Sequence, residues 1–372
     1  MTRSSHEFVE RLLSRADIQV GGTRPWDIQV HDNRLFARVL GQGSIGLGEA
    51  YMDGWWDAPR VDQFIEHLLR ARLDVEIKGD WRSILFVLSQ IVFNPQTRAK
   101  SAEVARVHYD LGNDLYRDML DPRMVYSCGY WQHAKTLADA QVAKLDLVCR
   151  KLDLKPGQQV LDIGCGWGGF AKYAAETYGV QVTGITVSVE QAALAKQMCE
   201  GLPVNILIQD YREIKGLYDH IVSIGMFEHV GYKNYRTYMQ VTHDHLKDGG
   251  YSLLHTIGTN VSTVTTDPWM VKYIFPNSML PSMAQIARAQ EGLFFMEDVH
   301  NFGPDYEPTL LAWSKNVESA WSDLSTHYDD RFYRMWQYYL LASAATFRIR
   351  DNHVWQIVLA KEGTRPRYQA VR

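Results

Sequence analysis

The sequence predicts an α/β protein with a doubly wound parallel sheet and a second, smaller N-terminal domain. Three observations lead to this fold class. From Lys144 onward, short apolar runs alternate with helical patterns, as they do in βαβ units. The run Gln159–Ile163 leads into a turn with four glycines among six residues, Gly164–Gly169, and a helical pattern follows. Residues 1–93 lack this alternation and differ in composition.

Composition excludes several classes of function. The chain has 372 residues, of which 46% are hydrophobic, so it can bury a large core, and we expect two domains. A net charge of −4 does not indicate a nucleic-acid-binding protein. None of the four cysteines forms a CxxC pair, so we expect no zinc site and no disulfide framework. The first residues lack the apolar core of a signal peptide, and we expect a reducing, cytoplasmic compartment.

The N-terminal domain is predicted to span 1–93. In order, we expect a helix at Phe8–Arg15, strands at Asp27–Val30 and Leu35–Val39, a turn at Gly41–Ser44, and an amphipathic helix ending at Arg70. The apolar run Ile84–Phe93 is about half the length needed to span a bilayer. It is interpreted either as a buried or interdomain helix or as a segment that docks on a membrane surface.

Residues 94–102 are polar and basic and contain a proline, so we interpret them as a linker before a second domain at 103–372. The strands expected in that domain are Gln159–Ile163, Gln181–Thr186, Val204–Ile208, His220–Ser223, Tyr251–Thr256 and Val354–Ala360. Ligands of such sheets bind beyond the C-terminal strand ends. The stretch from Thr259 to Pro281 interrupts the alternation, and we interpret it either as a packed insertion or as an apolar cover over a long substrate.

The glycine turn is the strongest single motif. Gly164-x-Gly166-x-x-Gly169 satisfies the dinucleotide fingerprint, which alone is weak. Asp162 precedes the first glycine, where a carboxylate would repel a pyrophosphate but attract an amine. The next strand, Gln181–Thr186, ends without an acid to hold a ribose. The pattern resembles motif I of the S-adenosylmethionine-dependent methyltransferases; a strand–turn–helix without any ligand is the alternative.

Five ordered motifs together resemble those of the cyclopropane-fatty-acyl-phospholipid synthase family. They are Tyr126-Ser127-Cys128, the glycine turn, Gly225–Gly231, Leu254–Gly258 and His300–Tyr306. The resemblance extends to Tyr51–Trp56 of the N-terminal domain and therefore covers nearly the whole chain. It implies a class I methyltransferase (Rossmann-like) fold with a mostly parallel, seven-stranded sheet, plus a smaller N-terminal α+β domain. Gly129 and Val299 depart from the alanine and tryptophan expected at these positions.

The resemblance implies that the methyl carbon of S-adenosylmethionine is inserted across a cis double bond of a phospholipid acyl chain. A carbocation would form and lose a proton to a bound bicarbonate ion. By resemblance, the residues that hold this ion are Cys128, Glu228, His255, Ile257 and Tyr306. A carboxylate, an imidazole, a phenol and backbone N–H groups suit that task. Each residue also has an ordinary structural alternative: Glu228 could cap a helix, His255 could lie in the core, and Tyr306 could merely pack.

The residues expected to bind S-adenosylmethionine follow from the same resemblance. Asp162, Gly164 and Gly166 should hold its methionine part. Gln191, with Thr186 at the preceding strand end, should contact the ribose, and Asp210 and Tyr211 should meet the adenine. Tyr126 and Ser127 should reach the cofactor from the preceding segment.

The implied partner is an unsaturated phospholipid in the bilayer. We therefore expect peripheral binding at the inner face of the cytoplasmic membrane, through an apolar rim that includes parts of 269–280, and by resemblance a homodimer. Three other functions stay open: formation of a methyl-branched or methylene fatty acid, methylation of a small molecule, and a non-catalytic lipid-binding role. No metal site is expected.

Overall fold

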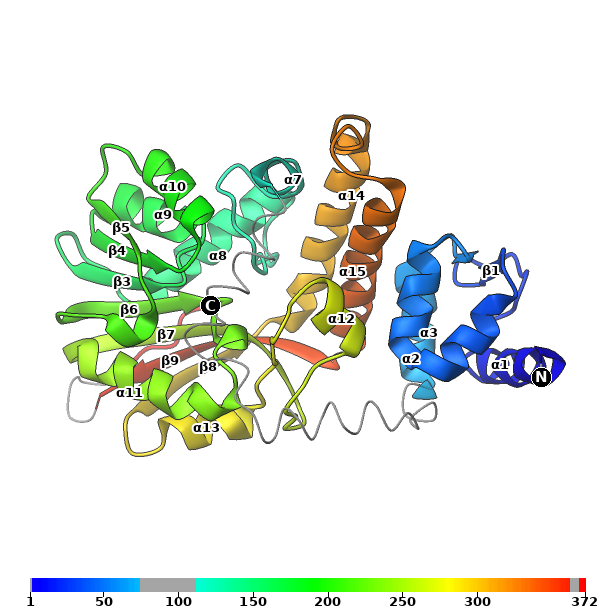
Figure 1. Cartoon of the computed structure of the whole chain (residues 1–372). Coiled ribbons are helices and arrows are strands. Elements are labelled where there is room, and N and C mark those ends of the chain that lie inside the picture. Colours follow the sequence, from blue (N-terminus) through cyan, green and yellow to red (C-terminus); the bar gives the residue numbers. More distant parts are fainter. Residues whose placement is uncertain (1, 74–111, 362–367) are drawn as a thin grey trace. The chain divides into compact units, whose positions relative to one another are not determined.

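The computed structural model describes residues 2–73, 112–361 and 368–372 (Figure 1). The predicted linker at 94–102 and the apolar run Ile84–Phe93 lie outside these residues. The chain divides into two compact units. The first contains Met1–Phe93, Thr265–Pro276 and Leu310–Asn352, and the second contains Asn94–Val264, Asn277–Thr309 and His353–Arg372. The sequence-based division places all of 103–372 in one domain, whereas two of its segments belong to the first unit here.

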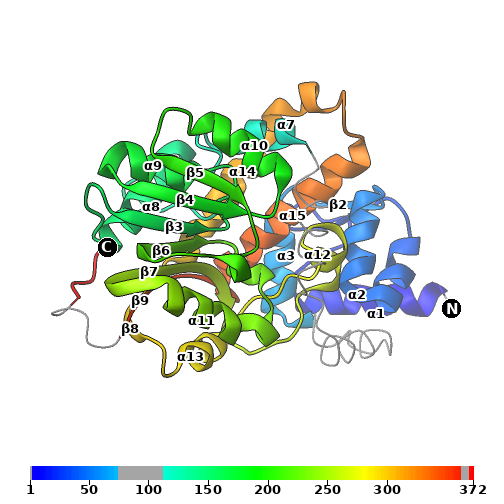
Figure 2. The ribbon, with the colours of Figure 1, turned by 60° about the vertical axis from the view of Figure 1, so that its left-hand side comes forward.

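A seven-stranded sheet forms the centre of the second unit, in the order β5-β4-β3-β6-β7-β9-β8 (Figure 2). Its strands are β3 (Gln159–Ile163), β4 (Gln181–Thr186), β5 (Val204–Ile208), β6 (Tyr218–Ile224), β7 (Leu246–Thr259), β8 (Phe295–Asn301) and β9 (Asn352–Ala360). The first five run parallel, and β8 pairs antiparallel with β9. The expected mostly parallel, seven-stranded sheet is thus confirmed.

Helices cover both faces of this sheet (Figure 1). Leu161 and Ile163 of β3 pack in one cluster with α11 (Tyr235–His245) and α13 (Met283–Gln290). Val160 of β3 packs on the opposite face with α8 (Leu137–Lys151) and α9 (Gly169–Tyr178). Successive residues of a strand point to opposite faces, so Asp162 lies on the α8 side. The unit also contains α7 (Asn113–Met119) and α10 (Val189–Met198).

Local sequence explains where these helices begin. The side chain of Thr136 accepts a hydrogen bond from the amide of Asp139 at the start of α8, and Ser188 accepts one from Gln191 at the start of α10. Ser282 and Gln285 form a reciprocal capping box at the start of α13. The expected strands at β3, β4 and β5 have the observed bounds, and β6, β7 and β9 extend beyond theirs.

The first unit is mainly helical. It contains α1 (Thr2–Arg15), β1 (Gln29–Val30), α2 (Arg34–Met52), β2 (Trp56–Asp57), α3 (Val61–Arg70), α12 (Pro268–Tyr273), most of α14 (Tyr306–Leu324), and α15 (Asp330–Arg348). The predicted strand at Leu35–Val39 is wrong, because these residues lie in α2. Leu35, Phe36 and Val39 are buried at helical spacing. The expected turn survives only as a kink at Gly43, whose φ is 56°.

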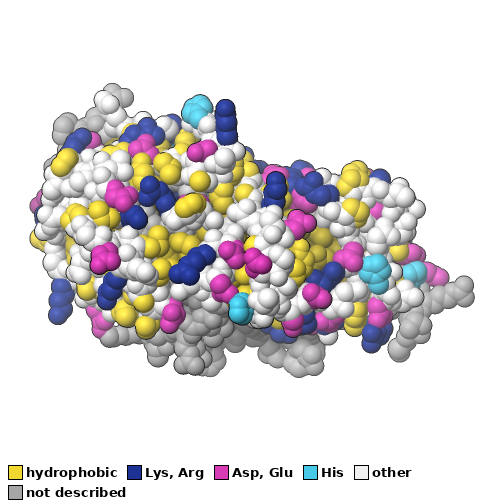
Figure 3. Space-filling model, turned by 90° about the horizontal axis from the view of Figure 1, so that it is seen from above, with side chains coloured by type: hydrophobic (Ala, Val, Ile, Leu, Met, Phe, Trp, Pro, Cys, Tyr) yellow, Lys and Arg dark blue, Asp and Glu magenta, His cyan; other side chains and the backbone are white. Residues whose placement is uncertain are grey.

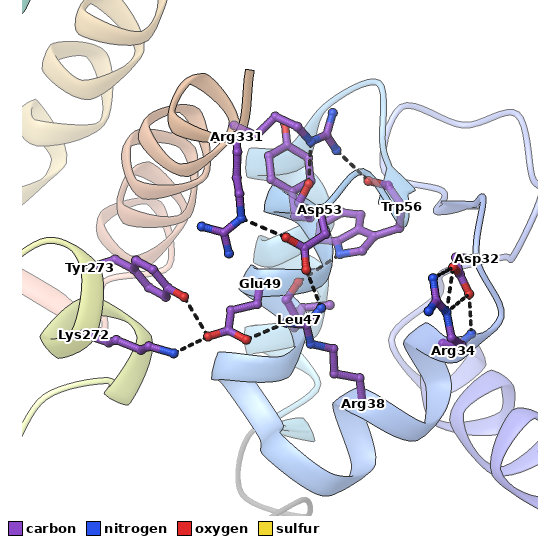
Figure 4. Close-up of polar contacts among 12 residues, drawn as sticks. Asp32, Arg34, Arg38, Leu47, Glu49, Asp53, Trp56, Lys272, Tyr273 and Arg331 are labelled. Atoms are coloured by element: carbon purple, nitrogen blue, oxygen red, sulfur yellow. Dashed lines mark hydrogen bonds and ion pairs between the residues drawn. The ribbon is translucent and has the colours of Figure 1, made fainter. Parts of the chain in front are cut away.

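A network of charges connects segments of the first unit that are far apart in sequence (Figure 4). The carboxylate of Glu49 accepts hydrogen bonds from Arg38, Lys272 and the hydroxyl of Tyr273, the last at 2.7 Å. Asp53 bridges Arg38 and Arg331 at 2.7 and 2.9 Å. These pairs tie α12 and α15 to α2 within the unit.

Three apolar side chains of the insertion after β7 are buried. Trp269, Ile274 and Met279 each expose only 1% of their surface. Adding a Cβ to Gly48 would bring it to 2.5 Å from the indole of Trp269, so this tryptophan fills the space beside α2. If parts of 269–280 form an apolar rim, these three residues are not among them, and the rim stays a prediction. On the face seen in Figure 3, basic and acidic side chains are interspersed.

No helix within 2–73, 112–361 or 368–372 combines the length and the hydropathy needed to cross a bilayer. The same residues contain no group of three or more histidines, cysteines or carboxylates that could hold a metal ion.

Candidate active site

The glycine turn joins the C-terminal end of β3 to α9. Gly164, Gly166 and Gly168 all have positive φ, at 84°, 54° and 84°, a conformation that favours glycine. A Cβ on Gly164 would lie 2.7 Å from the side chain of Met226, whereas one on Gly166 would meet nothing within 4 Å. The turn therefore leaves open space at Gly166, where a ligand can approach the backbone.

Asp162 is a buried carboxylate at the end of β3. It exposes 2% of its surface, and its Oδ2 atom has no hydrogen-bond partner among the described residues. Burial raises the pKa of Asp162 to about 7, and the nearby charge of Lys144 opposes that rise. A buried carboxylate oxygen without a partner is costly. The ammonium group of S-adenosylmethionine would satisfy it, so the residues fit this cofactor.

The other residues expected to bind the cofactor lie at the ends of β4 and β5. Thr186 Oγ1 donates to Gln191 Oε1 at 3.0 Å, and both side chains are buried. Asp210 accepts hydrogen bonds from the backbone N–H and the guanidinium of Arg212 at 2.9 and 3.3 Å. Tyr211 is buried and packs against Tyr238. The sheet places these residues at the same edge as the glycine turn.

The segment from Tyr126 to Cys128 is held by α8. Lys144 Nζ donates to Ser127 Oγ at 2.5 Å, and Gln141 Nε2 donates to the carbonyl oxygen of Ser127 at 2.7 Å. Lys144 and Gln141 are both fully buried. Tyr126 packs edge-on against Tyr116, with ring centroids 5.3 Å apart.

Cys128 is fully buried, and its thiol donates to the carbonyl oxygen of Gly129 at 3.2 Å. Burial, followed by the charge of Asp305, raises the pKa of Cys128 well above its ordinary value of 9.0, although Lys144 opposes this. The thiol therefore stays protonated, which disfavours a covalent nucleophile.

Glu228 and Ile257 contact each other directly. Glu228 lies in a 3₁₀ turn (Phe227–His229) after β6, and its Oε1 accepts a 2.7 Å hydrogen bond from the backbone N–H of Ile257. Glu228 Oε2 has no partner among the described residues. Burial raises the pKa of Glu228 to about 7, and the Ile257 hydrogen bond opposes that rise. The backbone N–H of Ile257 donates to Glu228 in this structure, and its expected role as a donor to the ion stays a prediction.

His255 lies two residues before Ile257 on β7. Its Nδ1 atom is 3.3 Å from the side-chain amide of Gln356 on β9, so the two groups share a hydrogen bond. Burial, followed by the charges of Lys144 and Lys151, lowers the pKa of His255 well below 6.5. The imidazole is therefore neutral at physiological pH and can both donate and accept one hydrogen bond.

Tyr306 is the first residue of α14 and is buried. The residues beside it are tied to the segment that follows Cys128. Thr309 Oγ1 accepts from the amide of Gly129 at 3.1 Å, and Asp305 accepts from the amide of Trp131 at 2.7 Å. The second unit thus links the start of α14 to the Cys128 segment.

Sequence reasoning missed three residues of this site: Gln141, Lys144 and Gln356. Lys144 is a cation whose charge opposes the rise in the pKa of Cys128. The available signal was helical spacing: Gln141 and Lys144 lie among the apolar positions Leu145 and Val148 on the buried face of α8.

Comparisons with known proteins identify the family of this chain. The family model described as "Mycolic acid cyclopropane synthetase" matches residues 96–357. The "Cyclopropane-fatty-acyl-phospholipid synthase" of Escherichia coli K12 is 50% identical over 356 residues, covering 96% of this chain and 93% of that protein. The "Probable fatty acid methyltransferase" of Pseudomonas putida is 34% identical over 349 residues, covering 86% and 87%.

A solved structure supports the fold and the cofactor site. The mycolic acid cyclopropane synthase CmaA1 in complex with SAH and CTAB superposes with a TM-score of 0.66 and 32% identity. The match covers 70% of this chain and 98% of that one.

Proposed function

The chain belongs to the mycolic acid cyclopropane synthetase family of S-adenosylmethionine-dependent methyltransferases, and we propose that it forms cyclopropane rings in phospholipids. A methylene group is added to the cis double bond of an unsaturated acyl chain. The observation that carries this proposal is the buried Glu228 carboxylate, which has one unpartnered oxygen, next to the β7 segment that bears the neutral His255. The named phospholipid synthase of E. coli supports the substrate class.

The cofactor supplies an electrophilic methyl group on its sulfonium. Asp162 Oδ2 binds its ammonium group, and the open backbone at Gly166 admits its methionine part. Polar groups at the ends of β4 and β5 hold the ribose and the adenine. The residues proposed for that role are Thr186, Gln191, Asp210 and Tyr211, with Tyr126 and Ser127 from the preceding segment.

Ring closure requires that one proton leave the added methyl group. The double bond would attack the methyl carbon while the carbon–sulfur bond breaks and S-adenosylhomocysteine leaves, so that the acyl chain becomes a carbocation. Loss of the proton then lets the ring close. Cys128, Glu228, His255, Ile257 and Tyr306 would hold a bicarbonate ion as the base, and the Ile257 N–H also fixes Glu228. Glu228, with a pKa of about 7, can accept a proton from the ion, and the neutral imidazole of His255 can share a hydrogen bond with it.

The substrate implies that the protein works at a membrane surface. We include in the proposal peripheral binding at the inner face of the cytoplasmic membrane, and a homodimer. The first unit, with residues 1–93, is a candidate for lipid docking or dimerisation. Co-sedimentation with vesicles, and mass measurement of the protein in solution, test these two points.

The reaction is tested by incubating purified protein with unsaturated phospholipid vesicles and methyl-labelled S-adenosylmethionine. The expected product gains one CH₂ group, carries the label, and resists mild hydrogenation, as a cyclopropane does. A labelled chain that is methyl-branched or carries a methylene group would contradict ring closure. It would favour instead the alternative suggested by the P. putida relative. Labelling of amines or phenols without labelling of lipid would contradict the lipid substrate.

A further inference from the structure

Three polar side chains are fully buried along α8: Gln141, Lys144 and Lys151. They are spaced so that they lie on the face turned toward the sheet. Lysine is rarely fully buried unless it is paired, because an ammonium loses its hydration there. Lys151 contacts His300 Nδ1 at 3.0 Å and lies 3.7 Å from Asp298. Lys144 has a different environment.

Lys144 points at the segment that carries the proposed site. Its Nζ atom donates to Ser127 Oγ at 2.5 Å, and no carboxylate within the described ranges forms an ion pair with it. Gln141, one turn earlier, donates to the carbonyl oxygens of Ser127 and Val125 at 2.7 and 3.4 Å. The two side chains together fix the backbone immediately before Cys128.

The charge of Lys144 acts on several groups of the site. It interacts electrostatically with Cys128, Asp121, Asp162 and His255. Asp162 lies on the strand face that α8 covers. Asp121 is already held by the amides of Arg123 and Val125. Burial lowers the pKa of Lys144 only to about 8, so most of the protein carries the ammonium at neutral pH.

We propose that Lys144 is a positioning residue for an anionic base: its buried ammonium makes a small oxyanion such as bicarbonate stable beside Cys128, and its hydrogen bond fixes Ser127. Where Asp162 and Glu228 are ionised they would repel a further anion, and the ammonium of Lys144 offsets that repulsion. The identity of the anion rests on the proposed function; the role of the cation rests on the contacts of α8.

The test measures anion binding without turnover. Purified full-length protein is saturated with S-adenosylhomocysteine, and its melting temperature is followed as bicarbonate replaces chloride at constant ionic strength. Four proteins are compared: wild type, Lys144→Gln, Lys144→Arg and Lys151→Gln. Glutamine can still donate to Ser127 but has no charge, and arginine keeps the charge. Lys151→Gln is the matched control, because it neutralises a buried lysine on the same helix.

Wild type should melt higher in bicarbonate, and Lys144→Arg and Lys151→Gln should keep most of that rise. Lys144→Gln should lose it, and its KM for bicarbonate in the lipid assay should rise about tenfold or more. An unchanged bicarbonate response in Lys144→Gln, or none in wild type, would overturn the inference.

The inference and the proposed function can fail separately. A bicarbonate response that depends on Lys144, in a protein that forms no cyclopropane, would refute the function and leave the inference standing. If Lys144→Gln forms cyclopropane with an unchanged KM for bicarbonate, the proposed function is supported and the inference about Lys144 is refuted. If Lys144→Gln does not fold, Gln141→Leu provides the second test. It loosens Ser127 without removing charge, so it should lower kcat while the bicarbonate response persists.

Discussion

Glu228→Gln should make the protein more stable at alkaline pH while it abolishes most of the activity. The carboxyl pKa lies at about 7 in the folded protein, above its ordinary value of 4.5. The protonated carboxyl therefore stabilises the folded protein. This stabilisation is complete below pH 4.5 and is lost as pH rises through about 7. The difference between the two values corresponds to about 3 kcal/mol, at 1.36 kcal/mol per pH unit. Glutamine stays neutral and avoids this loss.

Urea unfolding at pH 5, 7 and 8.5 measures the effect. Wild type and Glu228→Gln should have similar free energies of unfolding at pH 5, and the variant should be more stable by about 2–3 kcal/mol at pH 8.5. Cyclopropane formation should fall by roughly 10²-fold or more, the usual contribution of acid–base catalysis. A stability difference that does not grow with pH, or a variant that keeps its activity, would refute the reasoning.

Asp219→Asn is the matched control, because its pKa is shifted in the opposite direction. Burial raises the pKa of Asp219, but the amide of Gln159 and the ammonium of Lys247 lower it further, to a net value below 3.8. The contribution of Asp219 to the free energy of unfolding is present above pH 3.8 and is lost as pH falls below that value. Asp219→Asn should therefore destabilise the protein at pH 8.5 and leave activity per folded molecule unchanged.

Asp162→Asn should weaken S-adenosylmethionine binding by about tenfold or more in calorimetry. Wild-type affinity should rise as pH increases through about 7, because the ionised carboxylate binds the ammonium, and the variant should not show this rise. Gly164→Ala should destabilise the protein more than Gly166→Ala in urea unfolding. Alanine at either position costs about 1–2 kcal/mol because φ is positive, but only the Cβ at Gly164 meets another side chain. Equal losses in the free energy of unfolding would contradict this difference. Glu49→Gln should lower the free energy of unfolding by up to about 3 kcal/mol at pH 7, because the pKa of Glu49 is about 2 in the folded protein. The difference between the two proteins should vanish as pH falls through that value. A difference that persists at pH 2 would contradict the ion network.

The sequence predicted secondary structure best where the local preference of a segment agrees with its tertiary packing. The apolar strands β3 and β4 lie inside the sheet, and β5, although it is an edge strand, is a short apolar run bounded by turns, so the observed bounds of all three could be predicted. Leu35–Val39 shows the opposite case, because a short apolar run rich in branched and aromatic residues is ambiguous between strand and helix. The glycines that indicated a turn there are accommodated inside α2 by a kink at Gly43.

The candidate site was predictable only where its motif is contiguous. Asp162 lies at the end of a strand and the glycine turn follows it directly, so their positions could be predicted from neighbouring residues in the sequence. Lys144 and Gln356 could not be found in this way, because a lysine on a helix usually faces solvent and a glutamine on a strand has no motif. Their partners Ser127 and His255 are distant in sequence, and only the packing of α8 and β9 brings them together.

The position of β9 between β7 and β8 bears on how the protein is made. During synthesis on the ribosome, β8 emerges well before the strand it pairs with, and the edge of β7 stays open until β9 arrives. An open strand edge can pair with other chains, so this interval is the one in which the nascent protein is most prone to misassembly. The hydrogen bond between His255 and Gln356 forms only when β9 is inserted. This buried position of β7 therefore depends for its partner on a strand that is made near the end of synthesis.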